Sequence, residues 1–222
     1  MNLAGVILIS VLLPMSLSAE ETKEQAFWKW FEQNQEDLHH FEKDQEAVFN
    51  RLAKALHNVH QNLTFEFSAV REDGKREFVI SAGGIKAAFP SVESLYAAAP
   101  KLPKWTIVKF RQRHLPLHDV GFRGRTVKSD DVHYAFFKDE NPTKVGIMVF
   151  LDGYAEQEKD SVLAHIGFLF LDQALGEYDV ETHVGAIVFS NRESEHFRHA
   201  HPFSELPAHF DERLGRKKDS ER

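Results

Sequence analysis

The chain has no cysteine among its 222 residues, and this absence excludes several classes of protein. Disulfide-stapled folds, thiolate zinc sites, iron–sulfur clusters, thiol nucleophiles and lipid-modified cysteine anchors all need that side chain. The chain also lacks a positive net charge, because 27 Lys and Arg stand against 34 Asp and Glu, which gives −7. Since phosphate backbones are bound by basic surfaces, we expect no nucleic-acid partner.

Phosphate-loop spacing and the context of a serine nucleophile are also lacking, so no motif fixes a reaction. What the sequence does contain is typical of a folded protein. Hydrophobic residues make up 42% of the chain, and phenylalanine alone occurs 19 times. A chain of this length and apolar content can bury a substantial core.

Residues 1–19 carry no charged side chain and contain one apolar run, Leu3–Leu13. This run is shorter than the roughly 20 residues that span a bilayer, but it fits the central region of a signal peptide. Ser16, Ser18 and Ala19 offer small side chains for cleavage. No Lys or Arg precedes the run, which leaves two alternatives. One is an uncleaved anchor, and the other is a misassigned start codon, in which case the protein is cytoplasmic. We expect a periplasmic or secreted protein, without stable membrane insertion after cleavage of the leader.

Residues 22–60 are predicted to form an N-terminal helical arm. Thr22 and Gln25 have the spacing of a capping box, in which each residue satisfies a backbone N–H at the start of a helix. Apolar side chains then recur at three-, four- and seven-residue spacing, the period of one helix face. They are Phe27, Trp30, Phe31, Leu38, Phe41, Val48, Phe49, Leu52, Leu56 and Val59. The arm is therefore one helix bent near residues 40–44, or two successive helices.

Residues 61–190 show the period of two that is typical of β-strands, interrupted by helices. The order strand–strand–helix–strand occurs over residues 63–113 and again over residues 131–190, and the second helix is expected to end at Gly176. We therefore predict an α+β fold with a largely antiparallel sheet from two ββαβ units. This body and the helical arm are expected to form a single domain around a common apolar core.

One acidic row is a candidate site near the start of the last predicted strand. The row consists of Asp179, Glu181 and His183. Alternate residues of a strand share a face, so these side chains would be able to hold a divalent metal or act as base and acid. A basic row alternates in the same way on the third strand, at Lys109, Arg111 and Arg113. Cross-strand ion pairs between the rows are the preferred interpretation, and a metal site is the alternative.

Residues 191–222 are predicted to be a polar, partly disordered tail, rich in histidine and charge. Its cluster comprises Glu193, Glu195, His196, His199, His201 and His209. Imidazoles at this density can capture zinc, nickel or copper ions. Because the spacing matches no closed metal site, a solvated tail is the preferred interpretation.

The arm is rich in aromatic side chains between Phe27 and Phe31. Trp28 is rotated by about 100° from Phe27 around the helix, so we expect it to be partly exposed. Surplus aromatic residues commonly mark a docking surface, which makes Trp28 and Trp30 candidate interaction residues. Packing against the sheet is the preferred explanation for all of them except Trp28.

Four stretches are the most distinctive motifs of the sequence: FWKWF (27–31), EFVISA (77–82), AAPKLPKW (98–105) and LDQALGEYDVET (171–182). They resemble a family of uncharacterised bacterial proteins, and the last stretch is the most specific. The resemblance covers about residues 27–190, without the leader or the tail. Since the family has no assigned activity or catalytic residues, the resemblance implies no role for any residue.

The sequence favours a non-catalytic binding or interaction protein over an enzyme, because no motif fixes a reaction. The expected partner is a protein or a small-molecule ligand, held in a groove beside the aromatic arm, and no cofactor is expected. The alternative is a metal-binding protein or metal-dependent enzyme that holds a divalent metal through Asp179, Glu181 and His183.

Overall fold

A computed structural model of the chain describes residues 20–155 and 161–216. Helices and antiparallel-rich sheets give it an α+β fold, as the sequence predicts. The predicted signal peptide, residues 1–19, lies outside the described residues, as do residues 217–222. Within the described ranges, no helix combines the length and the apolar character that crossing a membrane requires.

The helical arm consists of two helices, α1 (Lys23–His39) and α2 (Gln45–Val59), separated by the short 3-10 helix η1 (Phe41–Lys43). The predicted capping box is confirmed. Gln25 N–H donates to Thr22 Oγ1 at 3.2 Å, and Thr22 N–H donates to Gln25 Oε1 at 3.0 Å. The apolar residues predicted for the arm lie on two successive helices and not on one bent helix, because η1 separates α1 from α2.

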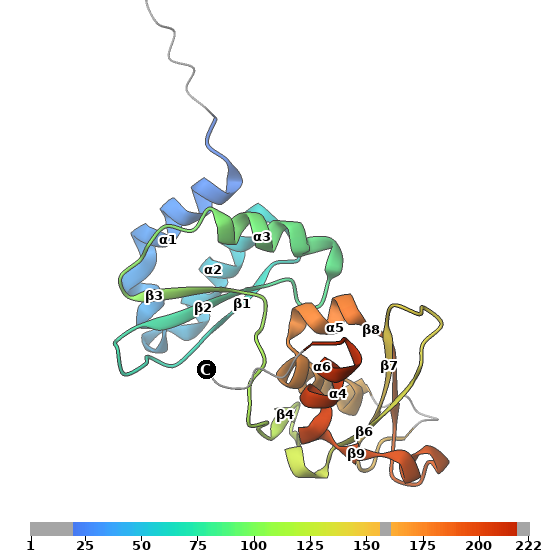
Figure 1. Ribbon diagram of the computed structural model, residues 1–222. Coiled ribbons are helices and arrows are strands. Elements are labelled where there is room, and N and C mark those ends of the chain that lie inside the picture. Colours follow the sequence, from blue (N-terminus) through green and yellow to red (C-terminus); the bar gives the residue numbers. More distant parts are fainter. Residues whose placement is uncertain (1–19, 156–160, 217–222) are drawn as a thin grey trace, which may run out of the picture.

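A three-stranded sheet packs against the arm in the predicted strand–strand–helix–strand order (Figure 1). Its elements are β1 (Thr64–Phe67), β2 (Arg76–Ser81), η2 (Lys86–Ala88), α3 (Phe89–Ala97) and β3 (Trp105–Lys109). β1 and β2 form an antiparallel hairpin, and Gly74 supplies the positive φ of +74° at its turn. Because the chain crosses over through α3, β3 is parallel to β2.

A second sheet repeats this order later in the chain. Its main elements are β6 (His133–Lys138), β7 (Val145–Phe150), α4 (Ser161–Leu175), α5 (Glu177–His183) and β8 (Val184–Ser190), preceded by β4 (Val120–Phe122), β5 (Arg125–Val127) and η3 (Ser129–Asp131). β6 and β7 are antiparallel, whereas β8 is parallel to β7. Gly176, with φ +79°, follows the last residue of α4, as predicted.

Residues 191–216 are part of this second unit, contrary to the solvated tail expected from the sequence. They form η4 (Glu195–His199), β9 (His201–Pro202), η5 (Phe203–Glu205) and α6 (Leu206–Arg213). β9 pairs with β6 at the edge of the sheet, whose order is β8-β7-β6-β9. Phe203, Leu206 and Phe210 are buried in the core at a spacing of three and four residues. That apolar helix face is the physical reason that the segment packs.

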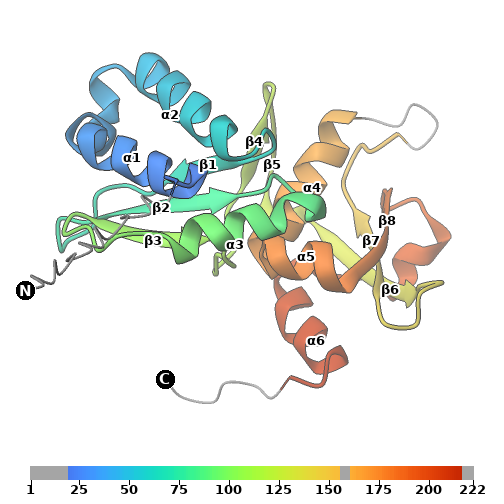
Figure 2. The same cartoon turned by 90° about the horizontal axis from the view of Figure 1, so that it is seen from above.

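The buried side chains form two separate clusters instead of the expected common core. The first lobe, residues 20–110, buries the arm and α3 against β1, β2 and β3. The second lobe, residues 120–216, buries α4 and α6 against β6 and β7. Each ββαβ unit thus closes over its own helices in a sheet of its own (Figures 1 and 2).

Candidate ligand-binding cleft between the lobes

The start of α5 joins the two lobes. Glu177, the first residue of α5, is completely buried, and its carboxylate accepts three backbone hydrogen bonds. The donors are Ala82 N at 2.9 Å, Gly84 N at 3.1 Å and Arg111 N at 3.1 Å. Glu177 N–H in turn donates to Arg111 O at 3.0 Å. Because a buried carboxylate needs such donors, this set fixes α5 against the first lobe and the connecting segment.

Aromatic side chains strengthen the same junction. Tyr178, next in α5, lies 5.7 Å from Phe89 and 5.4 Å from Phe110 between ring centroids. Phe110 has a φ of +59°, in the left-handed region that is costly for a residue with a large side chain. The ring packing and the bond from Phe110 N to Ile80 O, 2.8 Å long, hold it in that conformation. The relative position of the lobes is thus specified by dedicated contacts.

A cleft of about 290 Å³ opens beside this junction. Its lining residues are Glu66, Arg111, Gln112, His114, Asp119, Val120, Gly121, Leu169, Asp172 and Gln173. They come from β1 of the first lobe, from the connecting segment and from β4 and α4 of the second lobe. Small-molecule sites occur preferentially at such junctions.

Carboxylates outnumber cations in this cleft. Arg111 donates from Nε to Glu66 Oε1 and from Nη1 to Asp172 Oδ2, the latter over 3.4 Å. Two carboxylates therefore share one guanidinium group. Asp119 adds a third carboxylate to the lining and accepts a hydrogen bond from Ser129 N at 2.9 Å. The excess of negative charge favours a positively charged ligand.

Asp172 has the most unusual environment of these groups. Burial raises its pKa to about 6, and the Arg111 guanidinium opposes this shift. The carboxylates of Glu177, Glu181 and Glu66 raise the pKa further. A carboxyl group that changes charge near neutral pH inside a cleft is a common property of functional sites.

The predicted acidic row does not lie on a strand, so that prediction was wrong. Residues 177–183 form helix α5, because the hydrogen bonds of Glu177 fix its start and Val180 N donates to Gly176 O at 3.1 Å. Asp179 and His183 lie one helical turn apart, with 3.8 Å between Oδ1 and Nε2. Glu181 is directed elsewhere, toward Gly84. The three side chains therefore do not share one face.

Asp179 belongs instead to an ion-pair network that includes Arg113, as the preferred interpretation expected. The pairing is not cross-strand, because Arg113 follows β3 and Asp179 lies in α5. Arg113 Nη2 donates to Asp179 Oδ2 at 2.8 Å, and Arg216 donates to both oxygens, at 2.6 and 2.8 Å. Arg113 also binds Asp211 on α6. Burial alone would raise the pKa of Asp179, but the hydrogen bonds from Arg216 and Arg113 hold it below its usual range. Two guanidinium groups thus occupy the oxygens that a metal ion would need.

The two candidate docking residues differ in their exposure. Trp28 is only 3% exposed, and its Nε1 donates to Leu95 O of α3 at 2.8 Å. The expectation that it is partly exposed was wrong, because α3 covers the side of α1 to which it points. Trp30 is partly buried and lines a groove between α1 and α2, whose cations are Lys23, Arg51 and Lys54.

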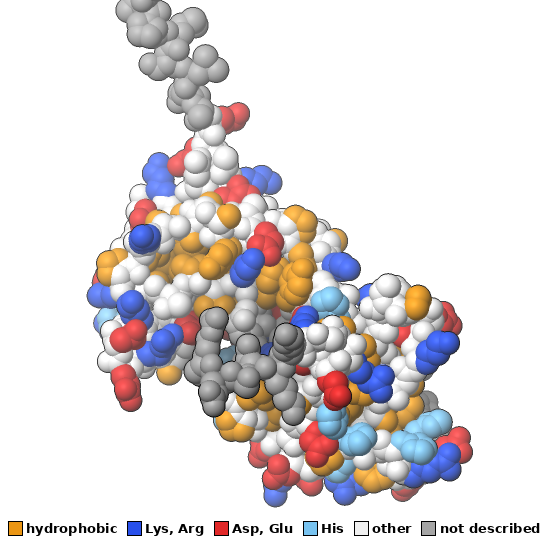
Figure 3. Space-filling view, viewed as in Figure 1, with side chains coloured by type: hydrophobic (Ala, Val, Ile, Leu, Met, Phe, Trp, Pro, Cys, Tyr) orange, Lys and Arg blue, Asp and Glu red, His pale blue; other side chains and the backbone are white. Residues whose placement is uncertain are grey.

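The structure also assembles part of the histidine set. Figure 3 shows histidine side chains gathered on the second lobe. His201 and His209 come together there with Glu205, which was not among the residues predicted from the sequence. The available signal is the spacing, because Glu205 lies four residues after His201 and four before His209. That spacing becomes informative only when the segment is known to be folded.

No family model, curated protein or solved structure matches the chain. The resemblance of residues 27–190 to an uncharacterised family stays a prediction. The chemistry of the cleft therefore has to be inferred from its own residues.

Proposed function

We propose that the chain is a non-catalytic binding protein that holds a small, positively charged organic ligand in the cleft between the lobes. The observation that carries this proposal is the position of Asp172, a carboxyl group in the cleft whose pKa is raised to about 6. It shares Arg111 with Glu66, so its charge is incompletely compensated. An incoming ammonium group would supply the missing positive charge.

The size and lining of the cleft support a small ligand of this kind. About 290 Å³ lies at the lower end of the range for small-molecule sites. Leu169 and Val120 offer apolar contacts to a short hydrocarbon chain, while Asp119 and Asp172 offer carboxylates to its charged ends. Because the cleft is lined by Glu66 of the first lobe and by Asp172 of the second, a ligand in the cleft contacts both lobes.

We expect alkyl diamines to bind in the cleft. Isothermal titration calorimetry with a homologous series of amines measures this binding. Carboxylic acids of matched length serve as control probes. Asp172→Asn and Asp119→Asn should each weaken binding about tenfold or more, since each removes one charged hydrogen bond. Wild-type affinity should rise between about pH 5 and pH 7, because Asp172 loses its proton in this range.

Asp130→Asn is the matched control, since Asp130 is exposed and does not line the cleft. Equal binding of the carboxylic acids, or an equal loss of affinity in Asp130→Asn, would contradict a cation site in the cleft. If NMR detected chemical conversion of a bound amine, this result would contradict the non-catalytic part of the proposal.

The proposal includes export, which is supported by the apolar run Leu3–Leu13 and the small residues that follow it. N-terminal sequencing of protein from the periplasm or the medium is expected to find the chain beginning after Ser18 or Ala19. An intact Met1 in soluble cytoplasmic protein would refute export, and it would leave the ligand proposal unaffected.

A further inference from the structure

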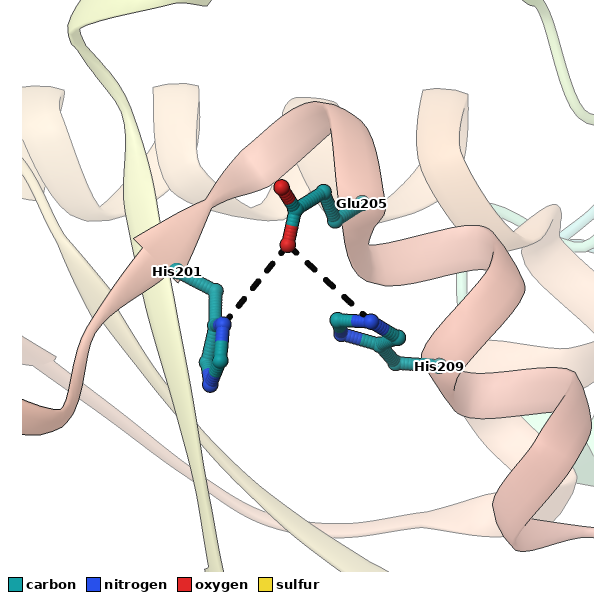
Figure 4. A group of neighbouring side chains, drawn as sticks. All are labelled: His201, Glu205 and His209. Atoms are coloured by element: carbon teal, nitrogen blue, oxygen red, sulfur yellow. Dashed lines mark ion pairs between the residues drawn. The ribbon is translucent and has the colours of Figure 1, made fainter.

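His201, Glu205 and His209 face one another on the surface of the second lobe (Figure 4). His201 belongs to β9, Glu205 ends η5, and His209 lies in α6. Glu205 Oε2 is 3.6 Å from His201 Nδ1 and 4.0 Å from His209 Nε2. The three ligand atoms all lie within 4.8 Å of one another.

These separations are too long for hydrogen bonds, which end near about 3.2 Å for nitrogen and oxygen. They are closer to the distance between two ligands of one ion. Ligand atoms about 2.0–2.1 Å from a tetrahedral zinc ion lie about 3.4 Å apart. Side chains that are about half exposed, as those of His201 and Glu205 are, can make the remaining adjustment by a small rotation.

His209 is held in place by a partner behind it. The Tyr134 hydroxyl lies 2.5 Å from His209 Nδ1, and Tyr134 is completely buried in the core of the lobe. This contact directs Nε2 of His209 toward Glu205. Metal-binding imidazoles characteristically use their second nitrogen in this way, and for Nε2 to bind an ion, Nδ1 must carry the proton and donate it to the tyrosine oxygen.

The geometry points to a binding site for one divalent transition-metal ion, with His201, Glu205 and His209 as its protein ligands. Two imidazoles and one carboxylate suit zinc, nickel or copper, whereas calcium and magnesium prefer oxygen ligands alone. Three protein ligands leave a coordination position for water or for a further group. The site shares no residue with the inter-lobe cleft, so it is independent of the proposed function.

Two further charged groups lie close to these ligands. A cavity of about 390 Å³ adjoins His201 and His209, and Glu212 and Arg213 contribute to its lining. Glu212 follows His209 by three positions in α6 and adds negative charge near the site. The Arg213 guanidinium lies over the Phe136 ring at 4.3 Å, and this contact holds the cation on the ring.

Calorimetric titration of the full, tag-free and chelator-treated chain with zinc chloride tests the site. The wild type is expected to bind one ion per chain, and calcium chloride is expected to give no binding. Tyr134→Phe should weaken zinc binding about tenfold, because it removes the group that orients His209. Glu205→Gln and His209→Ala should each cause a larger loss, because they remove a ligand.

The double variant His196→Ala/His199→Ala is the control, since these exposed histidines lie on η4, outside the three-residue site. Its affinity for zinc should equal that of the wild type. An equal loss in this control, or no stoichiometric zinc in the wild type, would overturn the inference. Cobalt(II) gives a second readout: its visible absorption at a four-coordinate site should be present in the wild type and absent in Glu205→Gln, which keeps the shape of the side chain.

Discussion

Replacing Glu177 by glutamine is expected to lower the free energy of unfolding by about 3 kcal/mol. The carboxylate is fully buried and accepts hydrogen bonds from Ala82 N, Gly84 N and Arg111 N. Hydrogen bonds to a charged group contribute about 1.5–3 kcal/mol each, and an unpaired buried donor costs about 1–3 kcal/mol. Glutamine keeps one accepting oxygen but turns its NH₂ group toward a backbone N–H. Urea denaturation measures the difference.

Glu195→Gln is the matched control, because the side chain of Glu195 is 82% exposed. Its stability should lie within about 0.5 kcal/mol of the wild type. Amide hydrogen exchange locates the effect of Glu177→Gln, which should lose protection first at Ala82, Gly84 and Arg111. If Glu177→Gln is as stable as the control, these three bonds do not hold the lobes together.

Much of the local structure could be predicted from the sequence, because it depends on short-range patterns. The capping box of Thr22 and Gln25 and the helix end at Gly176 are each fixed by neighbouring residues. The order of strands and helices followed from the change between a period of two and a helical period. Strand pairing involves contacts between distant residues, and the periodicity contains no information on it. For that reason the two ββαβ units could not be assigned to separate sheets.

The site residues could be predicted less well, because their environment is created by distant parts of the chain. Residues 178–183 alternate in a way that fits a strand, yet Glu177 binds donors up to 95 positions away and begins a helix there. The raised pKa of Asp172 likewise depends on burial and on Glu66, from the other lobe. The pairing of Arg113 with Asp179 was foreseeable from opposite charges, but its geometry, between the connecting segment and α5, was not.

In the last part of the chain, the sequence contains apolar residues at helical spacing, but the polar residues around them hide this pattern. Phe203, Leu206 and Phe210 have helical spacing, and this pattern accounts for the packing of α6. The polar residues around them are typical of a tail, and composition alone favours that interpretation. His201 and His209 lie next to each other only because these buried apolar residues hold the segment that carries both histidines in place.

Replacing Asp172 by asparagine is expected to raise the free energy of unfolding by about 1–3 kcal/mol at pH 8, the opposite of the effect at Glu177. The two carboxyl groups lie on either side of the turn at Gly176, but they differ in their donors. Glu177 has three backbone N–H groups, whereas the donor facing Asp172 among the described residues is Arg111, at 3.4 Å. Asparagine removes a charge that burial and the neighbouring carboxylates disfavour.

The sign of the pH dependence follows from the same pKa. Asp172 has a pKa of about 6 in the folded chain and an ordinary value of 3.8, so the folded state binds the proton more tightly. Wild-type stability from this group is therefore greatest below about pH 4 and is lost as the pH rises through 6. The stability difference between Asp172→Asn and wild type should be small near pH 4 and should grow to its full value above pH 6.

Urea denaturation of both proteins across this range measures the difference, with Asp130→Asn as a variant that should show no such trend. Lower stability of Asp172→Asn at pH 8 would mean that its ion pair with Arg111 outweighs burial. A gain in stability together with weaker amine binding would mean that the Asp172 carboxylate destabilises the folded chain but serves to bind a ligand. Such a conflict between function and stability is common at functional sites.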